Sequence, residues 1–193
     1  DRGRLIILWI YPGSFLCLML WAVLRRPVFG VGFIRGKPRK DRLVVRDLDK
    51  TMEQFKILLG AEPNRVIEKS PAAPGPKYYL GEERDFYQRA ALYQMNGIEF
   101  EILQPYNDRS ALTDFLDEHG DGIHHVAFDT DNFDAFEKHL NENGVQLIQT
   151  GPNSRHPALK WGFFNTNDKL GTMIEVTNFE EVAKLEAQEK EKK

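Results

Sequence analysis

Two adjacent histidines stand inside an apolar run at residues 122–128, GIHHVAF, which has the length and composition of a β-strand. Neighbouring side chains of a strand point to opposite faces. We therefore expect His125 to point away from the face that His124 shares with Val126 and Phe128. His125 is then either a metal ligand or a partly buried histidine that hydrogen-bonds to the backbone.

Two glutamates occupy the centres of alternating strand segments. Glu101 follows a glycine by four residues in the segment 97–103, GIEFEIL, and Glu175 does the same in the segment 171–177, GTMIEVT. A carboxylate in a strand centre is disfavoured by propensity and costly to bury. Together with His125 the two carboxylates suit a divalent Zn, Ni, Co, Mn or Fe ion, and three protein ligands leave a position for water or substrate.

The elements that must position these groups form an internal repeat. Residues 44–60 and 126–144 each read as a short apolar strand, an acidic turn and an amphipathic helix that ends at a glycine. The helix positions expected in the core are Met52, Phe55 and Leu59 in the first pass, and Phe133, Phe136 and Leu140 in the second. The expected caps are Asp47 or Asp49 and Gly60 for the first helix, and Asp131 or Asn132 and Gly144 for the second.

The segments between these elements are less regular. Ser110 is placed to cap a short helix in the link between the two passes, with Leu112, Phe115 and Leu116 inside. Residues 70–87 begin with several prolines and show no clear period, so we expect a flexible flap there. The end of the chain, from residue 180, reads as a charged, solvated helix.

Charge is distributed unevenly along the 193 residues. Of 26 basic and 29 acidic side chains, eight and one lie in residues 1–40, which leaves 18 and 28, a net charge of −10, for residues 41–193. A body this acidic argues against nucleic acid as a partner. The single cysteine, Cys17, excludes an internal disulfide framework and a metal site of several cysteines.

Residues 5–24 carry no charge and are as long as a membrane-spanning helix requires. They are a membrane anchor, an uncleaved targeting segment, or sequence foreign to the natural folded product. The basic residues that follow would keep the main domain on the cytoplasmic side of an anchor, so we expect a cytoplasmic domain in either case. We divide the chain into this N-terminal segment (1–27), a main domain (28–178) and a charged tail (179–193).

The repeat, the link and the closing GTMIEVTNF resemble the vicinal oxygen chelate superfamily, which includes glyoxalase I, bleomycin-resistance proteins and extradiol dioxygenases. Within it, the link is most similar to that of methylmalonyl-CoA epimerase and of glyoxalase-like relatives. The resemblance implies an α+β fold, in which two βαβββ modules form an open, curved mixed sheet around a central cleft. The modules would span 28–105 and 123–178, with the link at 106–122. A homodimer is an expectation from the resemblance alone.

The resemblance also implies one divalent metal ion in the cleft, bound by Glu101, His125 and Glu175. The fourth ligand of the family, usually histidine or glutamine, stands at the start of the first strand. Counting back from the strand end puts Lys40 there, whereas starting the strand at 28–33 and treating 35–42 as an interruption puts Gly30 there. Neither is a credible ligand, because an ammonium group must lose its proton and glycine has no side chain.

The chemistry implied is proton transfer next to a carbonyl group through a metal-stabilised enolate or enediolate, with Glu175 or Glu101 as the catalytic base. Epimerases of the family use a further carboxylate in the first module, but the matching strand, 87–92, has none. The reaction is therefore open between an isomerase and a carbon–sulfur lyase. The substrate would be a small molecule such as a CoA thioester or a glutathione adduct. The residues expected to bind it are Arg155, His156, Lys160 and Trp161.

A non-catalytic binding protein of the same fold is the alternative. The departure at the fourth ligand favours it, and so do the aromatic residues that could line a cleft for a hydrophobic ligand. These aromatic candidates are Tyr87, Tyr93, Trp161, Phe163 and Phe164. Against it, a binding protein has little need for two glutamates in strand centres facing one site.

Overall fold

The computed structural model describes residues 35–69, 75–95 and 97–191. The hydrophobic stretch at 5–24, Gly30 and the boundary expected after residue 27 lie outside the described residues. Among the residues that the structure describes, no helix is long and apolar enough to cross a membrane.

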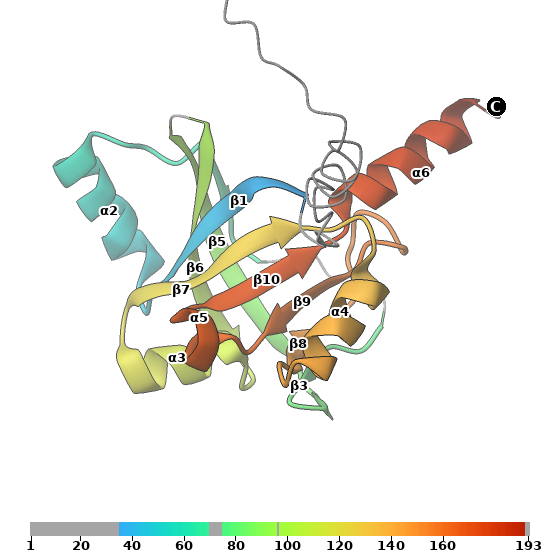
Figure 1. Ribbon diagram of the computed structural model, residues 1–193. Coiled ribbons are helices and arrows are strands. Elements are labelled where there is room, and N and C mark those ends of the chain that lie inside the picture. The colour runs from blue at the N-terminus through green and yellow to red at the C-terminus, as the bar shows by residue number, and fades with distance from the viewer. Residues whose placement is uncertain (1–34, 70–74, 96, 192–193) are drawn as a thin grey trace, which may run out of the picture. The chain divides into compact units, whose positions relative to one another are not determined.

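Ten strands of the described residues form one mixed sheet that curls strongly into a half-barrel (Figure 1). The strands are β1 (Arg35–Val44), β2 (Arg65–Ile67), β3 (Tyr78–Tyr79), β4 (Glu82–Glu83), β5 (Phe86–Met95), β6 (Ile98–Asn107), β7 (Gly122–Asp129), β8 (Leu147–Thr150), β9 (Trp161–Phe164) and β10 (Met173–Thr177). Their order in the sheet is β2-β5-β6-β1-β7-β10-β9-β8-β3-β4.

The sheet order shows the duplication directly. The first module contributes β2-β5-β6-β1 and the second contributes β7-β10-β9-β8, so each places its first strand at the centre. β1 is parallel to β6 and β7 is parallel to β10, while β1 and β7 pair antiparallel where the modules meet. The predicted α+β fold of two βαβββ modules in a curved sheet is confirmed.

Side-chain caps stand at the starts of three of the helices, as the sequence predicts. The helices are α2 (Leu48–Leu59), α3 (Ala111–His119), α4 (Phe133–Glu142), α5 (Asn167–Leu170) and α6 (Phe179–Glu191). Asp47, Ser110 and Asn132 accept hydrogen bonds from backbone N–H groups at the starts of α2, α3 and α4. Gly60 ends α2 in the left-handed conformation, with φ of 63°.

The apolar face of α2 differs from the prediction at its C-terminal end. Met52 and Phe55 pack against the core, but Leu59 is 62% exposed, and fully buried Leu48 occupies the first helical position instead. The last turn of α2 instead carries three exposed apolar side chains, those of Ile57, Leu58 and Leu59. In α4 the predicted core residues Phe133, Phe136 and Leu140 do pack together.

The stretch expected to be a flap contains a β-hairpin. β3 and β4 pair antiparallel around Leu80 and Gly81, whose φ values of 52° and 79° suit a tight two-residue turn. β3 also pairs antiparallel with β8 of the second module. The sequence period fails to reveal this hairpin because each strand is only two residues long.

The structure describes the first strand from residue 35 onward, so the interpretation that starts it at 28–33 stays a prediction. Residues 35–42, which the second interpretation treats as an interruption, belong to β1. β1 pairs with β6 and β7 through Lys40 to Val44, with a register shift against β7 between Arg35 and Lys40.

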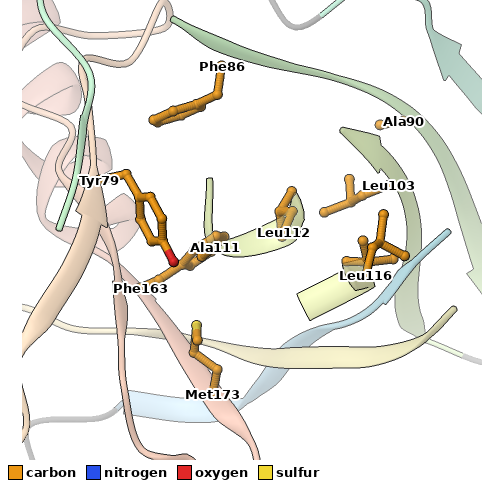
Figure 2. Close-up of a cluster of buried hydrophobic side chains, with 10 residues drawn as sticks. Tyr79, Phe86, Ala90, Leu103, Ala111, Leu112, Leu116, Phe163 and Met173 are labelled. Atoms are coloured by element: carbon orange, nitrogen blue, oxygen red, sulfur yellow. The ribbon is translucent and has the colours of Figure 1, made fainter. Parts of the chain in front are cut away.

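The main core lies where the two modules and the link helix meet. Figure 2 shows the side chains of α3 among those of strands from both modules. The buried members are Val44, Tyr79, Phe86, Ala90, Leu103, Ala111, Leu112, Leu116, Phe163 and Met173. Two contacts fix α3 further: Tyr79 Oη donates to Asp114 Oδ2 at 2.8 Å, and the Ala111 N–H donates to Gln149 Oε1 at 2.7 Å. The link helix α3 therefore contacts both modules.

Candidate functional site

Four neighbouring strands at the centre of the sheet contribute one side chain each to a buried cluster. In the order β6, β1, β7 and β10, these are Glu101, Arg42, His125 and Glu175. Arg42 lies opposite Glu101 on β6 and opposite His125 on β7. Glu175 pairs with Ala127, two residues beyond His125. The structure thus brings together the three predicted residues, and adds a fourth.

Arg42 stands at the middle of this cluster. Its Nη1 lies 2.6 Å from Glu101 Oε2, and its Nη2 lies 3.0 Å from Glu175 Oε2. His125 Nε2 lies 3.4 Å from the same Glu175 oxygen. The Arg42 side chain is 10% exposed and that of His125 is fully buried. One guanidinium group therefore bridges the two glutamates that the sequence singles out.

The charges of the cluster follow from these contacts. Burial by itself lowers the pKa of Arg42, but the Glu101 and Glu175 carboxylates raise it, and the net shift is upward. Burial lowers the pKa of His125, and Glu175 opposes this shift only in part, so the imidazole is neutral at neutral pH.

A bulge in β7 brings a second histidine to the same face. Arg42 pairs with His125, but the next residue of β1, Leu43, pairs with Ile123, so His124 has no partner in the register. The Nδ1 atoms of His124 and His125 lie 2.6 Å apart, and both rings contact Phe163. The expectation that the two histidines point to opposite faces is therefore wrong, because the bulge interrupts the alternation.

His124 is buried in an apolar environment. Its ring lies 5.0 Å from that of Phe115 on α3 and 5.5 Å from that of Phe163 on β9. Burial, together with the neighbouring His125, lowers the pKa of His124 to about 3. The two adjacent imidazoles are thus both neutral.

The cluster as arranged does not fit a divalent metal ion. One oxygen of each carboxylate, Glu101 Oε2 and Glu175 Oε2, is in an ion pair with Arg42, so a metal ion in the cluster would lie beside a guanidinium. Lys40 stands opposite Glu99 and Ala127, two residues before Arg42. The described part of the chain contains no group of three or more His, Cys, Asp or Glu side chains arranged to hold a metal ion. The metal-ligand role of Glu101, His125 and Glu175 stays a prediction.

The cluster opens into a cavity of about 340 Å³. Arg42 and Glu175 form part of its wall, so two members of the buried cluster face this space. Aromatic rings from both modules and from the start of α6 line the cavity: Phe86, Tyr87, Trp161, Phe163 and Phe179. A cavity of this size with a few convergent polar groups is typical of small-molecule sites.

One cation at the cavity wall escaped the sequence analysis. Lys77 lies just before the β3–β4 hairpin, and its Nζ lies 3.5 Å from the centre of the Tyr87 ring. The same Nζ donates to the Phe86 carbonyl at 2.5 Å and lies 3.4 Å from Asp85 Oδ1. Its sequence surroundings carry no motif, so only the fold reveals it.

Only one of the four predicted substrate-binding residues lies at the cavity. Trp161 lines the cavity, but the other three do not. Arg155 pairs with Glu186, and Lys160 Nζ lies 2.5 Å from Asp134 Oδ1. The imidazole of His156 accepts a hydrogen bond from the backbone of its own loop.

The aromatic candidates divide in the same way. Tyr87 and Phe163 line the cavity together with Trp161. Tyr93 packs in the core beside Phe55, and Phe164 packs with the side chains of α4.

Arg42 is a member of the candidate site that the sequence analysis does not single out. Its sequence signal is a charged side chain directly before the apolar run of β1, two positions after Lys40. The count back from the strand end reaches Lys40, two residues before the arginine whose side chain contacts the two glutamates. The length of the arginine side chain then lets its head reach both carboxylates.

The fold and the cluster together define a protein of two βαβββ modules with a buried charged cluster at the wall of an aromatic-lined cavity. The chain belongs to the glyoxalase/bleomycin resistance protein/dioxygenase superfamily, whose family model matches residues 42–163.

Solved structures with the same fold include methylmalonyl-CoA epimerases. The enzyme from Mycobacterium tuberculosis superposes with a TM-score of 0.52 at 21% identity, over 76% of this chain and 89% of that one. The Streptomyces coelicolor enzyme, in complex with 2-nitronate-propionyl-CoA, gives 0.50 at 22% identity, over 74% and 96%. At these identities the likeness shows the fold alone.

Two relatives match by sequence over shorter stretches. The Bacillus subtilis protein YqjC is 27% identical over 86 residues, which cover 45% of this chain and 61% of YqjC. The Caenorhabditis elegans protein C31H2.4 is 43% identical over 54 residues, which cover 28% of this chain and 15% of that protein. The chain thus spans less than two thirds of either relative.

Proposed function

We propose that this chain binds a small carbonyl compound in the cavity and moves a proton at the carbon next to the carbonyl, as an isomerase or a lyase. The observation that carries the proposal is the pairing of a carboxylate, Glu175, with a guanidinium, Arg42, at the wall of an aromatic-lined cavity. A carboxylate can accept the proton, and a guanidinium can stabilise the oxyanion that forms.

The geometry leaves Arg42 able to act on a bound molecule. A guanidinium group has five N–H donors, and the two ion pairs account for one each on Nη1 and Nη2. Donors that remain on the cavity side can approach a carbonyl oxygen. Glu101 and His125 then act as positioning residues, because they hold Arg42 and Glu175 in place.

The substrate class is narrowed by the cavity lining. The aromatic rings suit an organic acyl portion. Lys77 places a cation at the wall, where an anionic group of the ligand would compete with Asp85, which is largely exposed, for the Lys77 ammonium group. A CoA thioester and a glutathione hemithioacetal both combine a carbonyl or its equivalent with negative charge. We propose an activity of the methylmalonyl-CoA epimerase or lactoylglutathione lyase type on this basis. We derive no step through a divalent ion, because Arg42 holds the oxygens that would bind it.

Solvent deuterium exchange tests this proposal. In deuterium oxide, the full chain is expected to exchange the hydrogen next to the carbonyl of methylmalonyl-CoA or of a glutathione hemithioacetal, followed by mass spectrometry. Glu175→Gln should reduce the rate by about 10²–10⁴-fold. The matched control is Glu68→Gln, which removes a surface carboxylate paired with Arg89. Exchange that is unaffected by Glu175→Gln would overturn the assignment of the base.

A binding protein without catalysis is the second candidate. The aromatic lining from both modules favours it, and so does the engagement of both carboxylates by Arg42. This function predicts saturable quenching of Trp161 fluorescence by an aromatic carboxylic acid, with no exchange of any carbonyl substrate. Subtracting the quenching of the Trp161→Phe variant from that of the wild-type chain gives the quenching of Trp161 alone.

A further inference from the structure

The buried cluster already contains a cation, the guanidinium group of Arg42. Two carboxylates and one imidazole converge from three strands, and the group at their centre is the guanidinium of Arg42. The arginine comes from the fourth strand, β1, which lies between β6 and β7. The observed order of the strands therefore places the Arg42 side chain between Glu101 on β6 and His125 on β7.

The guanidinium competes with a metal ion for the same oxygen atoms. Glu101 Oε2 lies 2.6 Å from Nη1, and Glu175 Oε2 lies 3.0 Å from Nη2. A divalent ion that used these oxygens would have to displace Arg42 or stand directly beside a fixed positive charge. Two positive charges at such a short distance repel each other strongly in a buried environment.

Arg42 cannot leave this position without a cost elsewhere. Its side chain is 10% exposed, so a swing outward would leave the two carboxylates facing each other with little solvent. Glu101 and Glu175 are themselves 6% and 7% exposed. Breaking a buried ion pair by removing one partner is strongly unfavourable, because it leaves an uncompensated buried charge.

We infer that the Arg42 guanidinium takes the place of a divalent metal ion, so that the site of this chain works with a built-in organic cation. This inference deepens the proposed function, because the guanidinium then supplies the positive charge that stabilises the oxyanion. It also accounts for the presence of two carboxylates and an imidazole in one cluster in which Arg42 pairs with both carboxylates.

The inference makes a prediction that does not depend on activity. Removal of the guanidinium should turn the cluster into a metal site, because Arg42→Ala leaves one imidazole and two carboxylates with an open position. Arg42→Lys keeps the positive charge and should not have this effect.

The test is metal binding by the full chain after treatment with a chelator. Each variant is dialysed against Co²⁺ and then against Zn²⁺, and bound metal is measured by elemental analysis and by the visible spectrum of Co²⁺. The wild-type chain and Arg42→Lys should bind no ion at the cluster. Arg42→Ala should bind about one ion per chain, with an affinity at least about 100-fold above the wild type, and the further change His125→Ala should abolish it.

Two further variants control for the loss of any arginine and for a failure of Arg42→Ala to fold. Arg89→Ala removes an arginine that pairs with Asp49 and Glu68 away from the cluster, and should leave metal binding as in the wild type. Arg42→His serves where Arg42→Ala does not fold, as judged by circular dichroism. A wild-type chain that binds an ion lost on His125→Ala would overturn the inference, as would folded Arg42→Ala and Arg42→His chains that bind none. Absence of proton exchange would overturn only the proposed function.

Discussion

His124 and His125 are neighbours in sequence whose Nδ1 atoms lie 2.6 Å apart, although a regular strand would send them to opposite faces. The bulge at His124 places both rings against Phe163 and seals the inner end of the cluster with aromatic side chains. The bulge thus places two imidazole rings and Phe163 beside Glu175 and Arg42.

His124→Ala tests this packing. The loss of a buried ring between Phe115 and Phe163 should lower the free energy of unfolding by about 2–4 kcal/mol, because the space cannot close completely. Urea denaturation measures the change. His139→Ala, at an exposed position on α4, should change stability by less than about 0.5 kcal/mol. Equal effects of the two changes would contradict the packing argument.

Arg42→Met tests the ion pairs. Two carboxylates would remain buried without their cation, so the free energy of unfolding should fall by roughly 3–5 kcal/mol. Arg155→Met breaks a largely exposed pair with Glu186 and should cost less than about 1 kcal/mol. Both are measured by chemical denaturation at neutral pH. An Arg42→Met chain as stable as the wild type would show that the cluster does not need the guanidinium.

Tyr79 should give a distinct alkaline signal. Burial, and then the hydrogen bond to Asp114, raise its pKa from 10.0 to about 12. Because the folded chain holds this proton more tightly than the unfolded chain does, the stability that it contributes is present below pH 10 and is lost as the pH rises towards 12. Ultraviolet titration of the folded chain should show a late phenolate that Tyr79→Phe removes. Tyr78→Phe, its more exposed neighbour, should leave that phase unchanged.

Lys77→Met tests the cation at the cavity wall. If an anionic thioester binds in the cavity, loss of this charge should weaken binding by roughly 1 kcal/mol, or about fivefold in the dissociation constant. The effect should shrink at high salt. Calorimetry or Trp161 quenching measures it, and Lys138→Met, on the surface of α4, provides the control. An unchanged dissociation constant at low salt would place the anionic group elsewhere.

Gly162→Ala tests the packing behind β9. A Cβ at this position would lie 2.3 Å from Leu147 Cδ1 and 3.3 Å from Phe133 Cζ, so the core must shift to accept it. We expect a loss of about 1–3 kcal/mol in the free energy of unfolding. Gly122→Ala, whose Cβ would meet Phe115 at ordinary contact distance, is the matched control. Equal losses in the free energy of unfolding for the two variants would contradict the packing argument.

Much of the fold could be predicted because it rests on local signals. Capping by Asp47, Ser110 and Asn132 depends on residues within one helical turn, and the repeated strand-helix pattern depends on a short-range period. The convergence of Glu101 and Glu175 follows from the repeat, since equivalent positions of two modules face one cleft.

The remaining features depend on relations between distant segments. The bulge at His124 is defined only by the register of β7 against β1, which no local pattern specifies. Arg42 acquires its role from the reach of its side chain across two neighbouring strands. Arg155 and Lys160 look like ligands for an anion in sequence, but acidic side chains from α6 and α4 neutralise them in space.

The β3–β4 hairpin has a consequence for how the chain can be divided. By sequence it belongs to the first module, yet β3 completes the outer edge of the second through β8. Chains cut within the link would each carry an unpaired strand edge that only the other half can satisfy. The two fragments should therefore complement each other when mixed, and a single proteolytic nick in the link should leave the halves associated.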